Sequence, residues 1–203
     1  MKLNPITVSE ELMEGLRQVM ADPSLDAFHL VGGTSLALRF GHRRSIDIDV
    51  FSAQPFDAQT MAAHMTNRHG LRDAEVTDNT VRGFLNGVKL DMIAHVYPLL
   101  APVDTLEGVR MARLSDIAAM KLNAISNRGS KKDFWDYALL LDHFSHGKML
   151  EFFSCKYAAF NLWHVEKSVV YFDDAELDPD PVDLIGQTWD DVKKKVRSQS
   201  RNQ

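Results

Sequence analysis

The sequence predicts an α+β protein, with an α/β half over residues 1–110 and an α-helical half over residues 111–203. Three observations support this division. In the first half, short apolar segments typical of strands alternate with segments of helical periodicity. Asn86-Gly87 separates two strand-like segments, and Asn-Gly is the strongest two-residue hairpin signal. From about residue 111 onward, the apolar spacing becomes helical.

The first half is expected to alternate helices and strands before it ends in a β-ribbon. The expected helices are residues 7–20, 34–40 and 57–69, the expected strands are 27–31 and 45–51, and the ribbon spans 71–96. Thr7 and Glu10 have the spacing of a capping box at the start of the first helix. Gly41 and Gly70 suit the ends of the next two helices, because glycine readily adopts the left-handed conformation of a C cap.

The second half is expected to consist of helices and one linker. The expected helices are residues 115–126, 130–144, 148–154, 156–171 and 188–197, and the acidic segment 173–183 is expected to be an exposed linker. Ser115 and Ser130 are the predicted caps of the first two. The aromatic side chains between residues 152 and 171 are most simply explained as helical core.

The bulk properties are those of a soluble globular protein. Hydrophobic residues make up 45% of the chain, and the net charge is −5. Such a charge disfavours a general grip on nucleic acid, which usually requires a strongly basic domain. The single cysteine, Cys155, suits a reducing compartment. We find neither a signal peptide nor an apolar segment of about 18 residues, so we expect a cytoplasmic protein without a membrane contact.

Two aspartates and a glycine-rich turn predict a site for metal and phosphate. The turn is Gly32-Gly33-Thr34-Ser35, which follows an expected strand and begins an expected helix. Its backbone N–H groups and hydroxyls can bind phosphate, and glycine allows close approach. Asp47 and Asp49 lie two residues apart in the next strand, so both carboxylates point to one face about 7 Å apart.

These carboxylates suit Mg²⁺, which prefers hard oxygen ligands. One or two Mg²⁺ ions bound by Asp47 and Asp49 can hold a nucleoside triphosphate, either GTP or ATP. Asp91, in the second strand of the ribbon, is the candidate third metal ligand and the candidate base toward an acceptor hydroxyl. A water-exposed acid on an edge strand is the alternative interpretation of Asp91.

Charged residues of the helical half are candidates for contacts with the triphosphate. They are Lys121, Arg128, Lys131, Lys132, Asp133 and Asp136. Lys121 and Arg128 are seven residues apart, so they share a face if their helix extends far enough. Asp133 and Asp136 are three apart and also share a face. These residues also have simpler explanations. The lysines can be solvated, Asp133 can be a helix cap, and Asp136 can form an ion pair with Lys132.

Two further groups of residues lie outside these sets. His42-Arg43-Arg44 precedes the acidic strand, where it is either a solvated loop or a contact for phosphate or acceptor. His64 and His69 are expected to be surface histidines, because their spacing does not match a helical i, i+4 metal pair.

The ordered motifs resemble the minimal nucleotidyltransferase superfamily, and within it the AbiEii/AbiGii toxin family of type IV toxin–antitoxin systems. The motifs are Gly32–Ser35, Ser45–Asp49, Lys89–Asp91, and the block from Lys121 to Asp136. The resemblance covers residues 28–140. It implies a mixed β-sheet with flanking helices, followed by a helical domain that closes over the nucleotide.

The resemblance also implies roles for individual residues. Asp47 and Asp49 are metal ligands, and Gly33 and Ser35 lie near the phosphates. Lys121 contacts the nucleotide, and Lys132-Asp133 form the last catalytic motif. The family often has Arg-Asp in that motif, and a lysine keeps the charge but loses the bidentate guanidinium.

The leading hypothesis is an Mg²⁺-dependent nucleotidyltransferase that transfers a nucleotide from an NTP to an acceptor. By resemblance it is the toxin of a type IV pair, with tRNA or another RNA as acceptor and an antitoxin encoded nearby. A non-catalytic NTP-binding or protein-interaction module on the same fold is the alternative. A small antibiotic-modifying nucleotidyltransferase is a further alternative.

Overall fold

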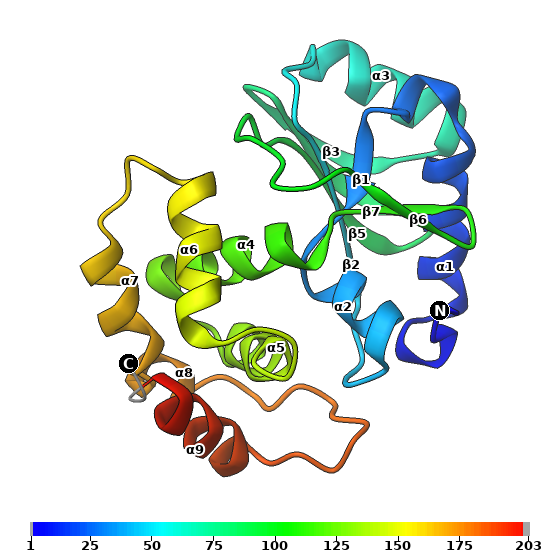
Figure 1. The fold of residues 1–203 in the computed structure, drawn as a ribbon. Helices are drawn as coiled ribbons and strands as arrows, with labels where there is room; N and C mark the ends of the chain where they lie inside the picture. Colours follow the sequence, from blue (N-terminus) through cyan, green and yellow to red (C-terminus); the bar gives the residue numbers. More distant parts are fainter. Residues whose placement is uncertain (1, 201–203) are drawn as a thin grey trace. The chain divides into compact units, whose positions relative to one another are not determined.

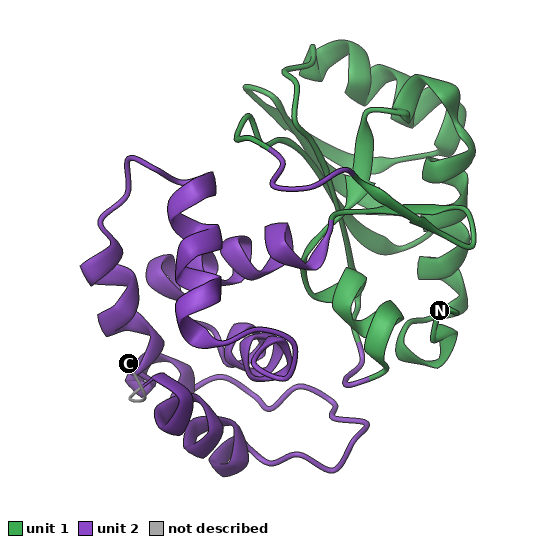
Figure 2. Ribbon diagram, viewed as in Figure 1, with its two compact units in different colours: residues 1–41, 45–98, 103–112 green, residues 42–44, 99–102, 113–203 purple. Residues whose placement is uncertain are grey.

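The computed structural model describes residues 2–200 and divides into two compact units (Figure 2). Unit 1 comprises residues 1–41, 45–98 and 103–112, and unit 2 comprises residues 42–44, 99–102 and 113–203. Between residues 2 and 200, no helix is long and apolar enough to cross a membrane.

Unit 1 contains a seven-stranded mixed sheet with the order β3-β4-β5-β2-β1-β7-β6 (Figure 1). The strands are β1 Phe28–Leu30, β2 Asp47–Ser52, β3 Arg72–Thr77, β4 Thr80–Leu85, β5 Val88–Ala94, β6 Asp104–Leu106 and β7 Val109–Met111. Strand β2 pairs with β5 in parallel, and β1 pairs with β7 in parallel. The remaining neighbours are antiparallel.

Helices complete unit 1 and form its core with the sheet. They are α1 Glu10–Ala21, α2 Gly32–Phe40 and α3 Ala58–His69, with short 3₁₀ turns η1 Pro5–Thr7 and η2 Pro23–Leu25. Apolar side chains of α1 and α3 share one buried cluster with Ile48 and Val50 of β2 and Leu90 and Met92 of β5. The face of β2 and β5 that carries these residues is therefore the core face of the sheet.

Unit 2 is helical in the part of the chain that is described. Its helices are α4 Leu114–Asn127, α5 Lys131–Leu140, α6 His146–Lys156, α7 Leu162–Val169, α8 Asp173–Glu176 and α9 Trp189–Ser200. Helix α4 packs against α5, α6 and α7. Around Trp189, the rings of Phe134, Trp135 and Phe172 lie 5.7–6.0 Å away between centroids. The expected α+β fold class, with a mixed sheet, flanking helices and a following set of helices, is confirmed.

Local signals predicted most elements, but several boundaries and caps differ. Ser9 caps α1 by accepting from the Leu12 N–H, whereas Thr7 donates its hydroxyl to Asn4 within η1. The capping-box prediction was therefore wrong. Arg113, not Ser115, precedes the first residue of α4. The antiparallel strands β6 and β7 were missed, since they are only three residues each.

The predicted ribbon exists, with Asn86-Gly87 between β4 and β5, but it is part of the large sheet. Strand β5 lies between β4 and β2, so the edge-strand interpretation of Asp91 is wrong. Two helical expectations also need correction. The expected helix 156–171 is interrupted, because α6 ends at Lys156 and α7 begins at Leu162. The expected linker 173–183 begins with the short helix α8.

Gly83 in β4 is required by the irregular pairing of β3. The register of β3 shifts between Arg72 and Glu75, and a Cβ on Gly83 would lie 2.7 Å from the Arg72 carbonyl oxygen. We expect Gly83→Ala to lower the free energy of unfolding by about 1–3 kcal/mol, because backbone must move to relieve the clash. Urea unfolding followed by far-UV circular dichroism measures it. The exposed turn variant Asp78→Ala is the control, and an equal effect of both would contradict the explanation.

Candidate active site

Three carboxylates lie on the face of unit 1's sheet opposite the core. In β2, Ile48 and Val50 are fully buried, so Asp47 and Asp49 alternate with them and point to the other face. The parallel register places Asp49 beside Asp91 of β5. Adjacent strands are about 4.8 Å apart, so the Asp49 and Asp91 side chains are direct neighbours.

The start of α2 lies against this acidic face. Gly32 has φ +66°, and a Cβ there would lie 3.0 Å from Asp49 Oδ2. The Val31 N–H also donates to the Asp49 carbonyl at 2.9 Å. Because α2 begins at Gly32 rather than at residue 34, both glycines belong to its first turn. The positive end of the helix dipole thus adjoins the carboxylates.

The two hydroxyls of this turn have different environments. Thr34 Oγ1 donates to the Asp47 carbonyl at 2.5 Å and lies 2.8 Å from Ser45 Oγ. Thr34 therefore ties the first turn of α2 to the start of β2. Ser35 is fully buried, and among residues 2–200 its Oγ has no hydrogen-bond partner. Buried hydroxyls usually have partners, so Ser35 retains capacity for a ligand.

Asp91 combines one paired and one unpaired oxygen. Lys89 Nζ lies 3.1 Å and Arg82 Nε 3.7 Å from Asp91 Oδ2. Asp91 Oδ1 is buried and has no hydrogen-bond partner among the described residues. The Lys89 and Arg82 side chains are both about half exposed, so they can move away from the carboxylate. The pattern of β4 gave no signal for Arg82, since its proximity comes from strand pairing.

Unit 2 contains a buried ionic network centred on α4 and α5. Lys121 Nζ lies 2.8 Å from Asp133 Oδ1 and 2.6 Å from Asp136 Oδ2. Burial disfavours the charged ammonium of Lys121, but the two aspartates outweigh it and raise its pKa. Asp133 and Asp136 thus share a helix face as predicted, and that face points into the protein.

The segment before β2 contributes two further members of this network. His42 Nε2 lies 2.8 Å from Asp136 Oδ1, and Arg43 donates to both oxygens of Asp136 at 2.7 and 2.8 Å. Burial disfavours the charged Asp136 carboxylate, but Arg43 and Lys121 hold its pKa well below the usual range. The expectation of a solvated loop at His42-Arg43-Arg44 was wrong for His42 and Arg43, which are buried.

Asp133 is satisfied from three directions. Besides Lys121, Arg128 Nε donates to Asp133 Oδ2 at 2.9 Å and Ser130 Oγ donates to the same oxygen at 2.6 Å. Ser130 precedes α5 as predicted, but its hydroxyl is a donor to Asp133 rather than an acceptor from the backbone. Burial opposes ionisation of Asp133, yet Lys121 and Arg128 lower its pKa far below the usual range.

The remaining predicted cations differ in exposure. Lys132 is exposed, whereas Asp136 is buried and pairs with Lys121 and Arg43. Lys131 is buried, with its Nζ 2.9 Å from Asp180 and 5.3 Å from the centroid of a Trp189 ring. Arg128 keeps 61% of its side chain exposed while it pairs with Asp133.

Comparison with known proteins identifies the family. The family model described as "Nucleotidyl transferase AbiEii toxin, Type IV TA system" matches residues 16–87, which include the turn and the acidic strand β2. An uncharacterised protein of Aquifex aeolicus, aq_aa25, is 33% identical over 207 residues, covering 96% of this chain and 98% of that protein. The chain belongs to the AbiEii family of nucleotidyl transferase toxins. This family member is therefore a nucleotidyltransferase.

Solved structures support the fold of this AbiEii family member. MenT4, a nucleotidyltransferase toxin from Mycobacterium tuberculosis, matches with a TM-score of 0.60 and 14% identity, covering 94% of this chain and 81% of that one. JHP933 from Helicobacter pylori matches with a TM-score of 0.57 and 20% identity, covering 95% and 88%. At these identities the likeness concerns the fold alone.

The ionic network predicts acid sensitivity of unit 2. Because the pKa values of Asp133 and Asp136 are depressed in the folded state, their stabilisation is fully present above the unfolded pKa of about 4. It is lost as the pH falls further toward the folded values. Trp135, Trp163 and Trp189 all belong to unit 2, so tryptophan fluorescence reports its unfolding. We expect the urea midpoint to fall steadily below about pH 4.

Removal of the Lys121 ammonium, which Asp133 and Asp136 share, tests the buried ionic network of unit 2. We expect Lys121→Met to lower the free energy of unfolding by about 3–5 kcal/mol at pH 7, because two buried carboxylates lose their common partner. The matched control is Lys148→Met, since Lys148 pairs with Glu151 on the surface and such pairs contribute little. A loss below about 1 kcal/mol for Lys121→Met would show that the network does not stabilise unit 2.

Proposed function

We propose that this chain is an Mg²⁺-dependent nucleotidyltransferase that transfers a nucleotide from GTP or ATP to an acceptor hydroxyl. The acceptor oxygen attacks the α-phosphorus, the bond from that phosphorus to the bridging oxygen breaks, and pyrophosphate leaves. The observation that carries the proposal is the in-register alignment of Asp49 with Asp91, next to the glycine turn that begins α2.

The residues at the acidic face fit a magnesium site. Asp47, Asp49 and Asp91 offer carboxylate oxygens on one face of adjacent strands, and Mg²⁺ takes such hard ligands together with phosphate oxygens and water. The partnerless Asp91 Oδ1 has capacity for such a ligand. Bound Mg²⁺ supplies charge neutralisation for the attacking and leaving oxygens.

The chain's own groups have separable roles in the proposal. Asp91 accepts the proton of the acceptor hydroxyl as the new phosphoester bond forms. Gly32 and Gly33 lie in the first turn of α2, where backbone N–H groups lack intrahelical acceptors and the helix dipole favours phosphate. Ser35 donates its hydroxyl to a phosphate oxygen, whereas Thr34 holds the turn in place through Asp47 and Ser45.

The charged residues of unit 2 divide by exposure. Arg128 and Lys132 keep exposed cationic groups, so we assign them to the triphosphate. Lys121 and Asp133 are buried against each other, so we assign them as positioning residues that fix Arg128 and the start of α5. In this role Lys132 acts as a point charge, so it does not need the two parallel hydrogen bonds that an arginine guanidinium would form.

The biological role in the proposal is that of a type IV toxin. The description of the matching family names such a system, which implies an antitoxin partner encoded nearby. We propose tRNA or another RNA as the acceptor, since an RNA terminus provides the hydroxyl that the reaction requires. A panel of radiolabelled nucleoside triphosphates with total RNA and Mg²⁺ tests both nucleotide and acceptor.

Asp49→Asn is the decisive variant for the metal site. We expect it to abolish label transfer, because the amide has no negative charge with which to hold Mg²⁺. The circular dichroism spectrum and melting temperature should stay close to those of the parent protein. The matched control is Asp26→Asn, an exposed acid of unit 1, which should transfer normally. Full transfer by Asp49→Asn would refute the mechanism.

Ser35→Ala and Thr34→Val distinguish a role in NTP binding from a role in stabilising the turn at the start of α2. We expect Ser35→Ala to lower kcat/KM for the NTP about tenfold without loss of stability, because its hydroxyl bonds to nothing within the described chain. Thr34→Val should lower the melting temperature, because it removes the bonds to Asp47 and Ser45. Unchanged kinetics in Ser35→Ala would remove Ser35 from the nucleotide site.

A further inference from the structure

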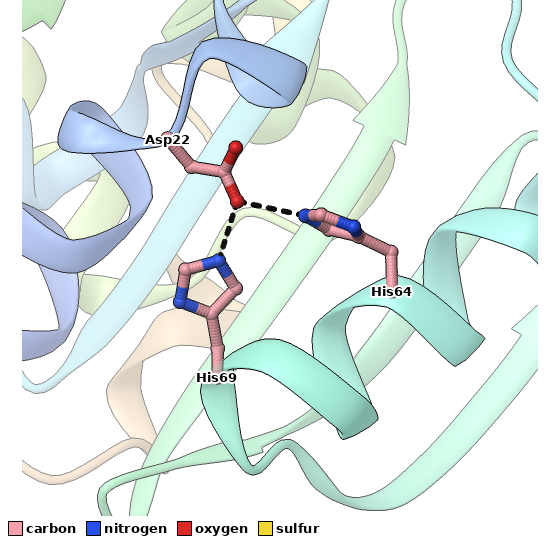
Figure 3. A group of neighbouring side chains, drawn as sticks. All are labelled: Asp22, His64 and His69. Carbon is pink, nitrogen blue, oxygen red and sulfur yellow. Dashed lines mark hydrogen bonds and ion pairs between the residues drawn. The ribbon is translucent and has the colours of Figure 1, made fainter.

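A second cluster of ligand-type side chains lies at the junction of α1, η2 and α3 (Figure 3). Asp22 comes from the turn between α1 and η2, while His64 and His69 come from the last two turns of α3. Each imidazole Nε2 lies 2.7 Å from the same oxygen, Asp22 Oδ2. All three potential ligand atoms lie within 4.8 Å of one another.

The carboxylate at the centre of this cluster is buried and ionised. Burial disfavours the charge of Asp22, but hydrogen bonds from His69, His64 and the Ser24 N–H lower its pKa below the usual range. The Ser24 N–H holds Oδ1 at 2.9 Å, which leaves Oδ2 directed at the two rings. Helix α3 also ends at His69, so its C-terminal dipole favours positive charge at this position.

We propose that Asp22, His64 and His69 form a Zn²⁺ site, with water as the fourth ligand. Two imidazole nitrogens and one carboxylate are a common zinc donor set, whereas Mg²⁺ requires oxygen ligands. Zinc-to-ligand distances of about 2.0–2.1 Å in a tetrahedron separate the ligand atoms by about 3.3 Å. The two nitrogens therefore need to withdraw from Oδ2 by about 0.6 Å each, which side-chain rotation supplies.

Binding exchanges two hydrogen bonds for three coordination bonds. In the metal-free state each Nε2 lies within hydrogen-bonding distance of Asp22 Oδ2, and in the zinc-bound state each Nε2 coordinates the ion while the ring proton is on Nδ1. No oxidant or reductant takes part. His64 retains 28% side-chain exposure, so the ion has access from solvent, and the more buried His69 anchors it.

Arg68 is the group that opposes a cation at this site. Its Nε lies 3.2 Å from Asp22 Oδ2, and its guanidinium charge repels a divalent ion. The Arg68 side chain is 63% exposed, so it can turn into solvent when zinc binds. The site is therefore weakened but not blocked by Arg68, and removal of that charge should strengthen binding.

The zinc site is separate from the acidic face of the sheet. Apolar residues of α1 and α3 belong to the same buried cluster as Ile48 and Val50 of β2, whereas Asp47 and Asp49 point to the opposite face of the sheet. The proposed ion links the turn after α1 to the end of α3, which are more than 40 positions apart in the chain. Zinc should thus stabilise unit 1 without being needed for nucleotidyl transfer.

The test is a titration of the full-length, chelator-treated protein with Zn²⁺ alone, followed by calorimetry and thermal melting. The protein used for the titration carries Asp49→Asn, so that the complete set of carboxylates on the acidic face is not present to bind zinc. We expect one zinc per chain and a melting temperature raised by about 5 °C or more at a hundredfold excess over Kd. Co²⁺ should give the visible absorption typical of a tetrahedral site.

Three variants decide the assignment. His69→Gln should weaken zinc binding at least tenfold, with His143→Gln as the control histidine. Arg68→Gln should tighten binding at least threefold, and this gain cannot arise from misfolding. Absence of zinc binding in the Asp49→Asn protein, or equal affinity in His69→Gln and its control, would overturn the proposal. Neither result bears on whether the intact protein transfers nucleotides.

Discussion

The parallel pairing of β2 with β5 is the constraint on which the acidic face depends. It aligns Asp49 with Asp91, while the intervening Ile48 and Val50 enter the core. A register shift of one residue would turn the carboxylates of one strand toward that core. Burial of the apolar residues therefore fixes the position of the charged ones, and the site inherits its geometry from hydrophobic packing rather than from contacts among the acids.

Sequence patterns predicted what is local and missed what is distant. Alternation in β2, the Asn86-Gly87 turn and the glycine caps of α2 and α3 depend on neighbouring residues, and all were recovered. The partner of Arg43 is Asp136, 93 positions later, and no periodicity records such a pair. The sequence showed that His42 and Arg43 precede the acidic strand β2, but it did not show that both side chains are buried.

The histidines of α3 show the same limit more sharply. The i, i+4 rule does not pair His64 with His69, which are five residues apart, so the sequence predicted two surface histidines; in the structure their ring centroids lie only 5.7 Å apart, and that expectation was wrong. Because His69 is the last residue of α3, its ring nevertheless reaches the carboxylate that His64 also contacts. Asp22, which lies outside α3, contacts both rings, and a spacing rule for residues of one helix does not take such a residue into account.

Saturation of hydrogen-bonding capacity distinguishes Asp136 in unit 2 from Asp91 in unit 1. A carboxylate has about four lone-pair positions. Asp136 receives two contacts from Arg43, one from His42 and one from Lys121, so it has no capacity left for a ligand. Asp91 Oδ1 has no hydrogen-bond partner among the described residues, although it is buried. Burial without a partner is costly, which makes Asp91 the acid whose environment a bound cation would improve.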